Sequence, residues 1–265
     1  MRFFARRHRH DETDEPVELT AEQRRTLQTR WPIWKLLGPD EQARMEPLIL
    51  RFIDDKRWEA ANGFAITEPI QVLVAAQACL LILERDYDDY RGVKSILVHK
   101  STVVLRGQRS TGTAGLVSSD PYRIDGQAQL GGPIMLSWDA AAYDARHPIR
   151  GQNVIFHEFA HKLDMLDGII DGTPPIRDAA ARARWVEVCT REFKRLRRSG
   201  DPSGVVRDYG AENPGEFFAV VTEVFFSRPL ELRAAKPELY EVLAGFYNQD
   251  PALRHPQPET PAVAG

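Results

Sequence analysis

The strongest constraint on the fold is a pair of histidines, His157 and His161, in a segment without glycine or proline that runs from residue 152 to residue 166. On a helix, two side chains four residues apart project from the same face. The segment also offers apolar residues that can pack against a core: Val154, Ile155, Phe159 and Leu163. The sequence therefore predicts a helix over about residues 152–166 that presents two imidazoles on neighbouring turns.

Two such imidazoles can take two of the four tetrahedral positions around one Zn²⁺ ion. Glu158 follows the first histidine, so its carboxylate can reach a water at the metal without being a ligand itself. The alternative is a surface helix on which the two histidines share a face and bind nothing. We favour a zinc site with Glu158 as its base, because acidic residues that can complete the ligand set accompany the helical pattern.

A catalytic zinc needs a third protein ligand and one open position. Three carboxylates are candidates: Asp164 on the same helix face, and Glu216 and Glu223 in a later apolar segment that is also predicted to be helical. The spacing favours Glu216 over Glu223 and Glu223 over Asp164, and it leaves the choice open.

Glu216 also has a structural explanation. Asn213 can cap the later helix and Pro214 suits its first position, so Glu216 stands where a carboxylate can satisfy a backbone N–H. Glu223 has no such explanation inside an apolar helix, and a buried carboxylate needs a partner.

Strands and helices are predicted in different parts of the chain. Apart from residues 152–166, the predicted helices are 20–30, 40–55 with an interruption or a kink near Pro47, 67–83, 178–198, 214–227 and 237–248. The predicted strands are 94–98, 102–105 and 133–138. A run of strands followed by a block of helices favours an α+β fold. Residues 133–138 are either an edge strand that pairs with an extended peptide or an ordinary buried strand.

The ends of the chain differ from its middle. Residues 1–17 are charged and poor in apolar side chains, which predicts a flexible arm. Residues 251–265 contain Pro251, Pro256, Pro258 and Pro261, which predicts a flexible tail. Between them we expect a single domain over residues 18–250.

The charge balance argues against nucleic acid and anionic membranes as partners. The net charge is −3 and the isoelectric point is near 6.2, so the basic runs at residues 6–10 and 194–198 are interpreted as solvated faces. The two cysteines, Cys79 and Cys189, are expected to be reduced core residues. The longest apolar run, residues 72–83, is too short to span a bilayer and no signal core follows the N-terminus, so we expect a cytoplasmic protein.

From about residue 20 onward, the chain resembles the Mlc titration factor A family, which are bacterial zinc peptidases linked to glucose regulation. The residues that carry the resemblance are Leu136–Asp139, Asn153–Val154, His157–Asp164, Tyr209, Pro214, Glu216, Phe218–Val220, Glu223, Phe225–Ser227 and Phe246–Pro251.

The resemblance implies a zincin-like domain of the gluzincin type: a small mixed β-sheet, an active-site helix and further helices around them. It implies one Zn²⁺ per chain held by His157, His161 and Glu216, with Glu158 as the catalytic base. It also implies that Tyr209 projects into the site and stabilises the oxyanion, although a tyrosine at this spacing is more often a packing residue. Glu223 and Asp164 then become residues that orient ligands.

For activity, the resemblance implies an aminopeptidase-like hydrolase acting on peptides. It also implies binding of the transcriptional repressor Mlc or an equivalent, which would regulate glucose uptake. The alternative is a non-catalytic regulatory protein that sequesters a repressor and in which the zinc site is structural or vestigial. Glu158 argues against that alternative, because a purely structural site needs no base beside its ligand.

Overall fold

The computed structural model describes residues 18–61, 63–101, 103–105, 109–110, 117–118, 122–124, 126–128 and 132–255. The α-helices in these ranges are α1 (Ala21–Arg30), α2 (Pro39–Asp55), α3 (Glu68–Leu81), α4 (Trp138–Arg146), α5 (Val154–Asp164), α6 (Ala179–Ser199), α7 (Pro214–Ser227), α8 (Pro229–Ala235) and α9 (Pro237–Tyr247). Short 3₁₀ helices lie between them: η1 (Pro32–Leu36), η2 (Tyr87–Tyr90), η3 (Pro148–Arg150), η4 (Met165–Asp167), η5 (Asp208–Ala211) and η6 (Pro251–Arg254).

The described strands form one small mixed sheet and two short antiparallel pairs. The four-stranded sheet has the order β1 (Arg57–Ala60), β2 (Ser95–His99), β8 (Ile134–Ser137) and β7 (Gly126–Ala128). The first three of these strands are parallel, and β7 runs antiparallel to β8. The pairs are β3 (Val103–Leu105) with β6 (Tyr122–Ile124) and β4 (Arg109–Ser110) with β5 (Val117–Ser118). The expected combination of a small mixed sheet with many helices is confirmed.

Strand β8 decides between the two alternatives left open for residues 133–138. It lies between β2 and β7, so within the described sheet it is an inner strand and is not free to pair with an extended peptide. The strand also ends at Ser137, whose hydroxyl accepts from the amide of Ala140 and caps α4. Trp138 therefore begins a helix that the sequence pattern did not reveal.

Local sequence signals account for several helix starts. Thr20 and Gln23 form a capping box at α1, with each side chain accepting from the other's backbone N–H at 3.2 and 2.8 Å. Helix α2 is continuous from Pro39 to Asp55 with Pro47 inside it, so the helix is not interrupted there. Helix α3, predicted over residues 67–83, is buried at Ile70 and at all positions from Val72 to Leu81, so it is a core helix.

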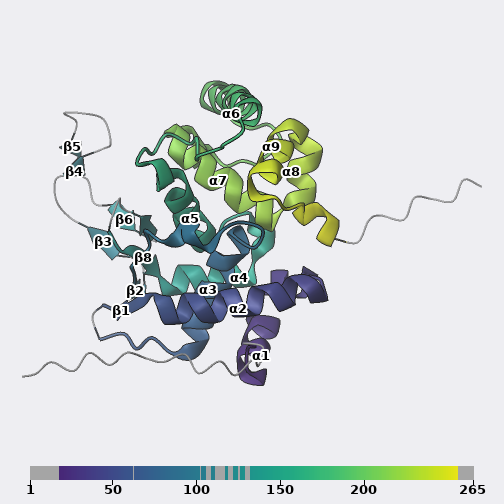
Figure 1. Ribbon diagram of the computed structural model, residues 1–265. Helices are drawn as coiled ribbons and strands as arrows, with labels where there is room; N and C mark the ends of the chain where they lie inside the picture. The colour runs from purple at the N-terminus through teal and green to yellow at the C-terminus, as the bar shows by residue number, and fades with distance from the viewer. Residues whose placement is uncertain are drawn as a thin grey trace, which may run out of the picture.

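Helices α5 and α7 lie side by side in the middle of the molecule. Figure 1 shows the strands on one side, α1 to α3 along one end, and α6, α8 and α9 at the opposite end. Helix α5 contacts α7, α3 and the sheet strands β7 and β8, while α7 also contacts α6, α8 and α9. One cluster of buried apolar side chains extends from Leu19 to Ala252 and joins these layers. The candidate ligands thus stand on two helices that the core holds against each other.

The C-terminal boundary differs from the prediction. Residues 251–254 form η6, and Ala252 is fully buried, so the folded chain continues past the expected start of the tail at Pro251. The amide of Ala252 donates to the hydroxyl of Tyr240 at 2.9 Å, which fastens η6 to α9. The predicted arm at residues 1–17 and the rest of the predicted tail, residues 256–265, lie outside the described residues.

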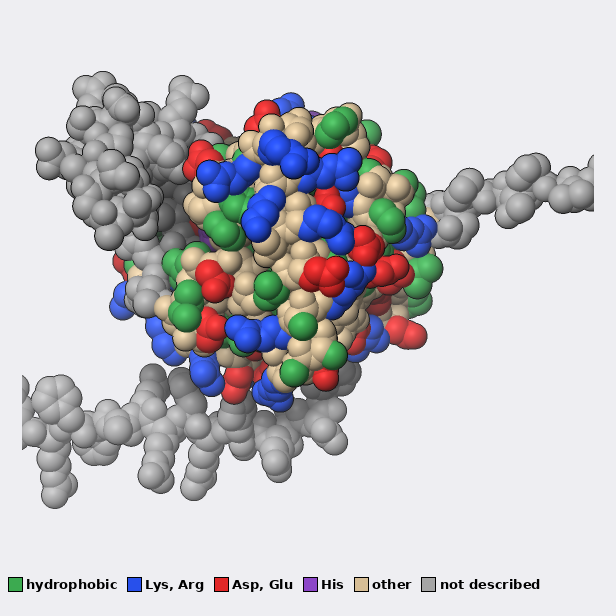
Figure 2. All heavy atoms as spheres, turned by 90° about the horizontal axis from the view of Figure 1, so that it is seen from above, with side chains coloured by type: hydrophobic (Ala, Val, Ile, Leu, Met, Phe, Trp, Pro, Cys, Tyr) green, Lys and Arg blue, Asp and Glu red, His purple; other side chains and the backbone are tan. Residues whose placement is uncertain are grey.

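Two composition-based predictions can be compared with the structure. Cys79 and Cys189 are free and buried, as expected for core thiols. The basic run at residues 194–198 lies on α6, where its four charged side chains are exposed while Leu196 is buried. Figure 2 shows Lys and Arg side chains gathered on this face with acidic side chains nearby. Among the described helices, none is both long and apolar enough to cross a membrane.

Candidate metal centre

The two histidines are presented by α5 as the sequence predicts. Asn153 caps the helix, because its side-chain oxygen accepts from the amide of Phe156 at 3.0 Å. His157 and His161 are both buried, and their ring centroids are 4.8 Å apart. The apolar positions between and beside them face the core; Phe159 packs 5.0 Å from the ring of Tyr90. The backbone that carries the two imidazoles is therefore held in place, and both rings project from the same face of α5.

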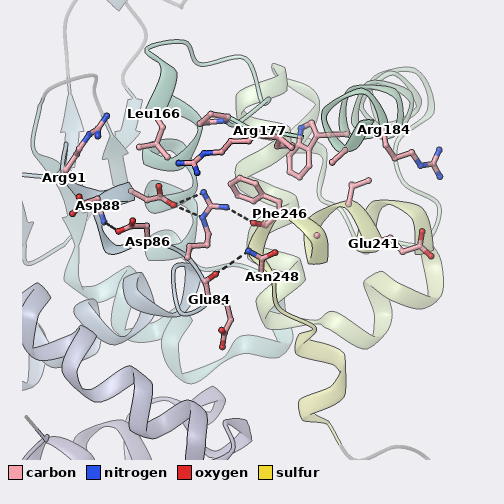
Figure 3. A pocket seen from close by; sticks show the side chains of 18 residues that line it. Glu84, Asp86, Asp88, Arg91, Leu166, Arg177, Arg184, Glu241, Phe246 and Asn248 are labelled. Atoms are coloured by element: carbon pink, nitrogen blue, oxygen red, sulfur yellow. Dashed lines mark hydrogen bonds and ion pairs between the residues drawn. The ribbon is translucent and has the colours of Figure 1, made fainter. Parts of the chain in front are cut away.

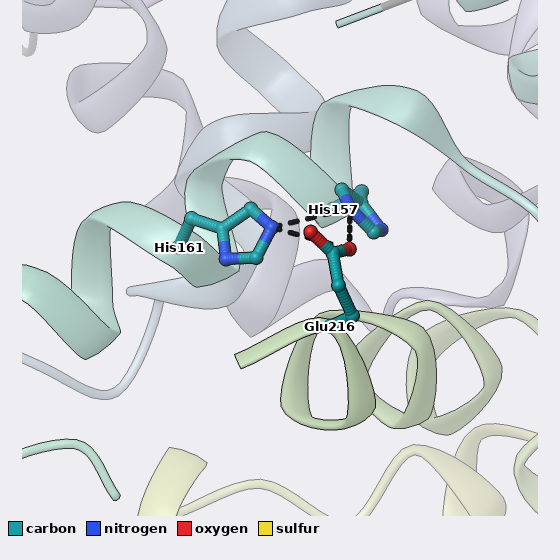
Figure 4. Close-up of side chains that lie close together, drawn as sticks. All are labelled: His157, His161 and Glu216. Carbon is teal, nitrogen blue, oxygen red and sulfur yellow. Dashed lines mark hydrogen bonds and ion pairs between the residues drawn. The ribbon is translucent and has the colours of Figure 1, made fainter. Parts of the chain in front are cut away.

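The third group comes from the first turn of α7. Asn213 accepts from the amide of Glu216 at 2.9 Å and Pro214 occupies the first helical position, so the predicted N-cap is confirmed. The carboxylate of Glu216, however, faces α5. Its Oε2 lies 3.0 Å from Nε2 of His157 and 3.6 Å from Nε2 of His161, and the two Nε2 atoms are 3.2 Å apart (Figure 4).

These three atoms fit the ligand set of a tetrahedral cation. Bonds of about 2.0–2.1 Å at tetrahedral angles place ligand atoms roughly 3.3 Å from one another, close to the separations found here. Two imidazole nitrogens and one carboxylate oxygen are also the donors that catalytic zinc sites use, with a fourth position left open. His157, His161 and Glu216 form the group in the described part of the chain that can hold a metal ion. Asp164 and Glu223 are not members of that group.

The electrostatics of the group favour positive charge where the three atoms meet. Burial lowers the pKa of His157, but hydrogen bonds to Glu216 and Glu223 outweigh burial and raise it to about 10. Burial tends to raise the pKa of Glu216, and its contacts with His157 and His161 bring it well below the usual value. The same carboxylates attract a divalent cation, which would displace the proton from His157 on binding.

Glu158 is buried beside this group. Burial raises the pKa of its carboxyl to about 7, with the charge of His157 acting in the opposite direction. Its Oε2 has no hydrogen-bond partner among the described residues. A carboxyl that changes protonation near neutral pH is suited to accept and return a proton.

Glu223, the closest rival for the third ligand position, contacts the other nitrogen of His157. Its Oε1 lies 2.7 Å from Nδ1 of that ring, and its Oε2 accepts from the amide of Asn153 at 2.6 Å. Glu223 therefore holds the back of the imidazole whose Nε2 faces Glu216. The sequence signal that singled it out was a carboxylate in an otherwise apolar helix.

Asp164 connects α5 to the segment that follows it. It is fully buried, its Oδ2 accepts from the amide of Gly172 at 2.9 Å, and burial raises its pKa to about 6. Gly172 in turn accepts from the indole of Trp185 on α6 at 2.9 Å. This segment also packs against the start of α7, since a Cβ on Gly172 would lie 2.3 Å from the carbonyl oxygen of Pro214.

Tyr209 and Arg207 lie next to the metal group, on and just before η5. The ring centroid of Tyr209 is 5.9 Å from that of His157. Arg207 donates from Nη2 to Oε1 of Glu223 at 2.5 Å. Sequence reasoning missed Arg207, because a single arginine in a loop shows no periodicity and no spacing that links it to the histidines.

A cleft of about 920 Å³ opens elsewhere, between η2, η4, α6 and α9 (Figure 3). His157, His161 and Glu216 do not line it. Arg85 at its wall binds Asp89 at 2.7 Å and donates to the carbonyl oxygen of Phe246 at 2.7 Å, so these contacts join η2 to the end of α9.

The sequence is similar to one family of metallo-peptidases and to several bacterial proteins. The sequence matches the family described as glucose-regulated metallo-peptidase M90 over residues 4–248. The Mlc titration factor A of Escherichia fergusonii is 32% identical over 237 residues, which cover 87% of this chain and 88% of that protein. The Mlc titration factor A of Edwardsiella ictaluri is 34% identical over 232 residues, covering 84% and 86%. An uncharacterized protein of Synechocystis sp. is 34% identical over 229 residues, covering 86% and 83%.

Proposed function

This chain belongs to the glucose-regulated metallo-peptidase M90 family, and we propose that it is a zinc-dependent, zincin-like peptidase that acts as an aminopeptidase. The observation that carries the proposal is the convergence of His157, His161 and Glu216 from α5 and α7, with ligand atoms 3.0–3.6 Å apart. This donor set suits zinc and leaves a fourth position for the chemistry. Glu158, buried beside the first ligand, supplies the base that a purely structural zinc site would not need.

The residues of the chain would divide the reaction between them. His157, His161 and Glu216 bind and orient the zinc ion, which, when bound, supplies Lewis acidity to a water and to the scissile carbonyl. Glu158 takes the proton from the attacking water and returns it to the leaving amine. Burial holds the pKa of Glu158 above its usual value, which favours acceptance of this proton.

Tyr209 would contribute through its hydroxyl. A donor aimed at the developing oxyanion stabilises the transition state more than the ground state. The ring of Tyr209 lies near that of His157, on the short helix that precedes α7. Tyr209→Phe is therefore expected to lower kcat and to leave zinc content unchanged.

The proposal is tested by the zinc content and the hydrolytic activity of Glu158→Gln. We expect this variant to bind zinc as the wild type does and to lose hydrolysis of aminoacyl chromogenic substrates and of short peptides. Glu46→Gln, which changes a buried carboxylate on α2, is the matched control and should keep its activity. Full peptidase activity in zinc-loaded Glu158→Gln would refute the mechanism.

A second candidate function is repressor binding. The observation that favours it is the name of the relatives, Mlc titration factor A, at 32–34% identity over most of both chains. The chain would bind Mlc or an equivalent repressor and so affect glucose uptake, with or without catalysis. Capture of purified Mlc by wild type and by the zinc-free double variant His157→Ala/His161→Ala separates the two roles. Equal capture by both proteins would make sequestration independent of the metal site.

A further inference from the structure

We propose that Arg207 is a positioning residue of the metal site and that it acts through Glu223 on His157. The inference rests on the proposed function in one respect, namely that His157 is a zinc ligand. It adds a residue outside the group of His157, His161 and Glu216, and it assigns that residue a role in how tightly zinc is held.

The three side chains form a continuous chain of contacts. Nη2 of Arg207 donates to Oε1 of Glu223 at 2.5 Å, and the same oxygen lies 2.7 Å from Nδ1 of His157. The side chain of Glu223 is 2% exposed, whereas that of Arg207 is 31% exposed. A partly exposed guanidinium thus reaches the histidine through one buried carboxylate.

This contact decides which nitrogen of His157 carries the hydrogen. An ionised carboxylate only accepts hydrogen bonds, so Nδ1 must donate to Glu223. In the neutral ring Nε2 then holds a lone pair, and Nε2 is the atom that lies 3.0 Å from Glu216 in the metal group. Orientation and tautomer of a metal-binding histidine are commonly fixed in this way by a carboxylate behind it.

The second oxygen of Glu223 is held as firmly as the first. Oε2 accepts from the amide of Asn153 at 2.6 Å, and Asn153 is the N-cap of α5. The side chain of Asn153 also donates to Oε1 of Gln77 at 2.7 Å, which ties the start of α5 to α3. Glu223 is therefore fixed relative to the helix that bears His157, and it has little freedom to follow a moving ring.

Arg207 supplies the positive charge that offsets the burial of the Glu223 carboxylate. The carboxylates of Glu158, Glu216 and Glu223 are gathered around His157, and a buried negative charge is costly without a nearby cation. The guanidinium of Arg207 brings a positive charge and a charge-assisted hydrogen bond to Glu223. Without Arg207, Glu223 would lose its charge-assisted hydrogen bond and would be freer to turn away, and His157 would lose its acceptor.

The other histidine provides an internal contrast. Nδ1 of His161 has no hydrogen-bond partner among the described residues. Loss of the Arg207–Glu223 pair should therefore weaken one ligand and leave the other as it is. The expected defect is a weaker and distorted metal site, and the ligand group itself should remain.

The test measures zinc affinity without relying on hydrolysis. Zinc dissociation constants are determined by competition with a chromophoric chelator for wild type, Arg207→Met, Glu223→Gln and the double variant, and cobalt(II) spectra report the geometry of the site. We expect each single variant to bind zinc roughly 10–100-fold more weakly and to change the visible cobalt spectrum. The double variant should be no weaker than Glu223→Gln, because Arg207 acts through Glu223.

Arg24→Met is the matched control. Arg24 forms an ion pair with the buried Glu46 on α2 at 2.7 Å and is 36% exposed, so the two arginines are similar in burial and in partner. This control should lower the melting temperature of the metal-free protein and leave the zinc affinity unchanged. If Arg207→Met does not fold, Arg207→Gln, which removes the charge and keeps a donor, replaces it in the same comparison.

Two results would overturn the inference while leaving the proposed function intact. One is wild-type zinc affinity in folded Arg207→Met, and the other is additive losses in the double variant. Failure of the proposed function has a different signature, since His157→Ala would then bind zinc as wild type does.

Discussion

The carboxylate of Glu216 on α7 lies 3.0 Å from Nε2 of His157 on α5, while Glu223, two turns further along α7, lies 2.7 Å from Nδ1 of the same ring. The two carboxylates thus hold opposite nitrogens of one imidazole. Only one of these nitrogens faces His161, whose Nε2 is 3.2 Å from Nε2 of His157. This arrangement gives the two glutamates separable roles.

The difference between the roles of Glu216 and Glu223 can be measured as zinc affinity. Glu216→Ala removes a proposed ligand and should weaken zinc binding by more than about 100-fold, whereas Glu223→Ala removes a group behind a ligand and should cost roughly 10–100-fold. Zinc content after dialysis, together with competition titration, distinguishes them. Equal zinc occupancy of Glu216→Ala and wild type would rule out Glu216 as the third ligand.

The second prediction concerns Gly172, which has a φ of +74° and leaves no room for a side chain beside Pro214. Gly172→Ala should lower the free energy of unfolding by about 1–3 kcal/mol and weaken zinc binding, because the start of α7 must shift and carries Glu216 with it. Urea denaturation and zinc titration measure the two effects.

Gly204→Ala is the matched control for that variant. Gly204 has a similar φ of +63°, but a Cβ there would meet no atom within 4 Å. Gly204→Ala should lower the free energy of unfolding through backbone strain alone, and it should bind zinc as the wild type does. Normal zinc binding by Gly172→Ala as well would mean that this loop does not position Glu216.

The third prediction concerns pH and Asp201, whose side chain is 4% exposed. Burial raises its pKa, but the amide of Val206, the hydroxyl of Ser203 and the ammonium of Lys236 outweigh burial and lower it. A carboxylate with a depressed folded pKa contributes stability that is present above its unfolded pKa of about 3.9 and is lost as the pH falls through the folded value.

Asp201→Asn should therefore destabilise the protein by about 1–3 kcal/mol at pH 7 and by clearly less near pH 3. Chemical denaturation of both proteins at the two pH values measures this difference. Glu187→Gln, an exposed acid on α6, controls for the loss of one surface charge. A destabilisation that is the same at both pH values would mean that the charge of Asp201 contributes nothing.

Sequence patterns predicted those parts of the fold that depend on local signals. The bounds of α7, residues 214–227, were predicted because Asn213 and Pro214 mark its start and the apolar run its end. Helix α4 was missed, since its first residue, Trp138, looks like the last residue of a strand. Strand β1 was missed because four residues with no buried position show no alternation.

At the candidate site, too, the features that depend on local sequence were predicted and those that depend on tertiary contacts were not. His157, Glu158 and His161 share one helix, so their spacing alone predicts a common face, and Glu223 was noticeable as a charge in an apolar helix. The spacing of Glu216 and Glu223 could not decide which of them completes the group with Nε2 of both histidines, because that depends on how α7 packs on α5. Arg207 depends entirely on tertiary contact, since it meets Glu223 only after the chain has folded.

The most direct test of the central claim is anomalous diffraction at the zinc edge from crystals of the zinc-loaded protein. We expect one strong peak about 2 Å from Nε2 of His157, Nε2 of His161 and a carboxylate oxygen of Glu216. A zinc ion bound at another place, or one ligated by Glu223 in place of Glu216, would contradict it.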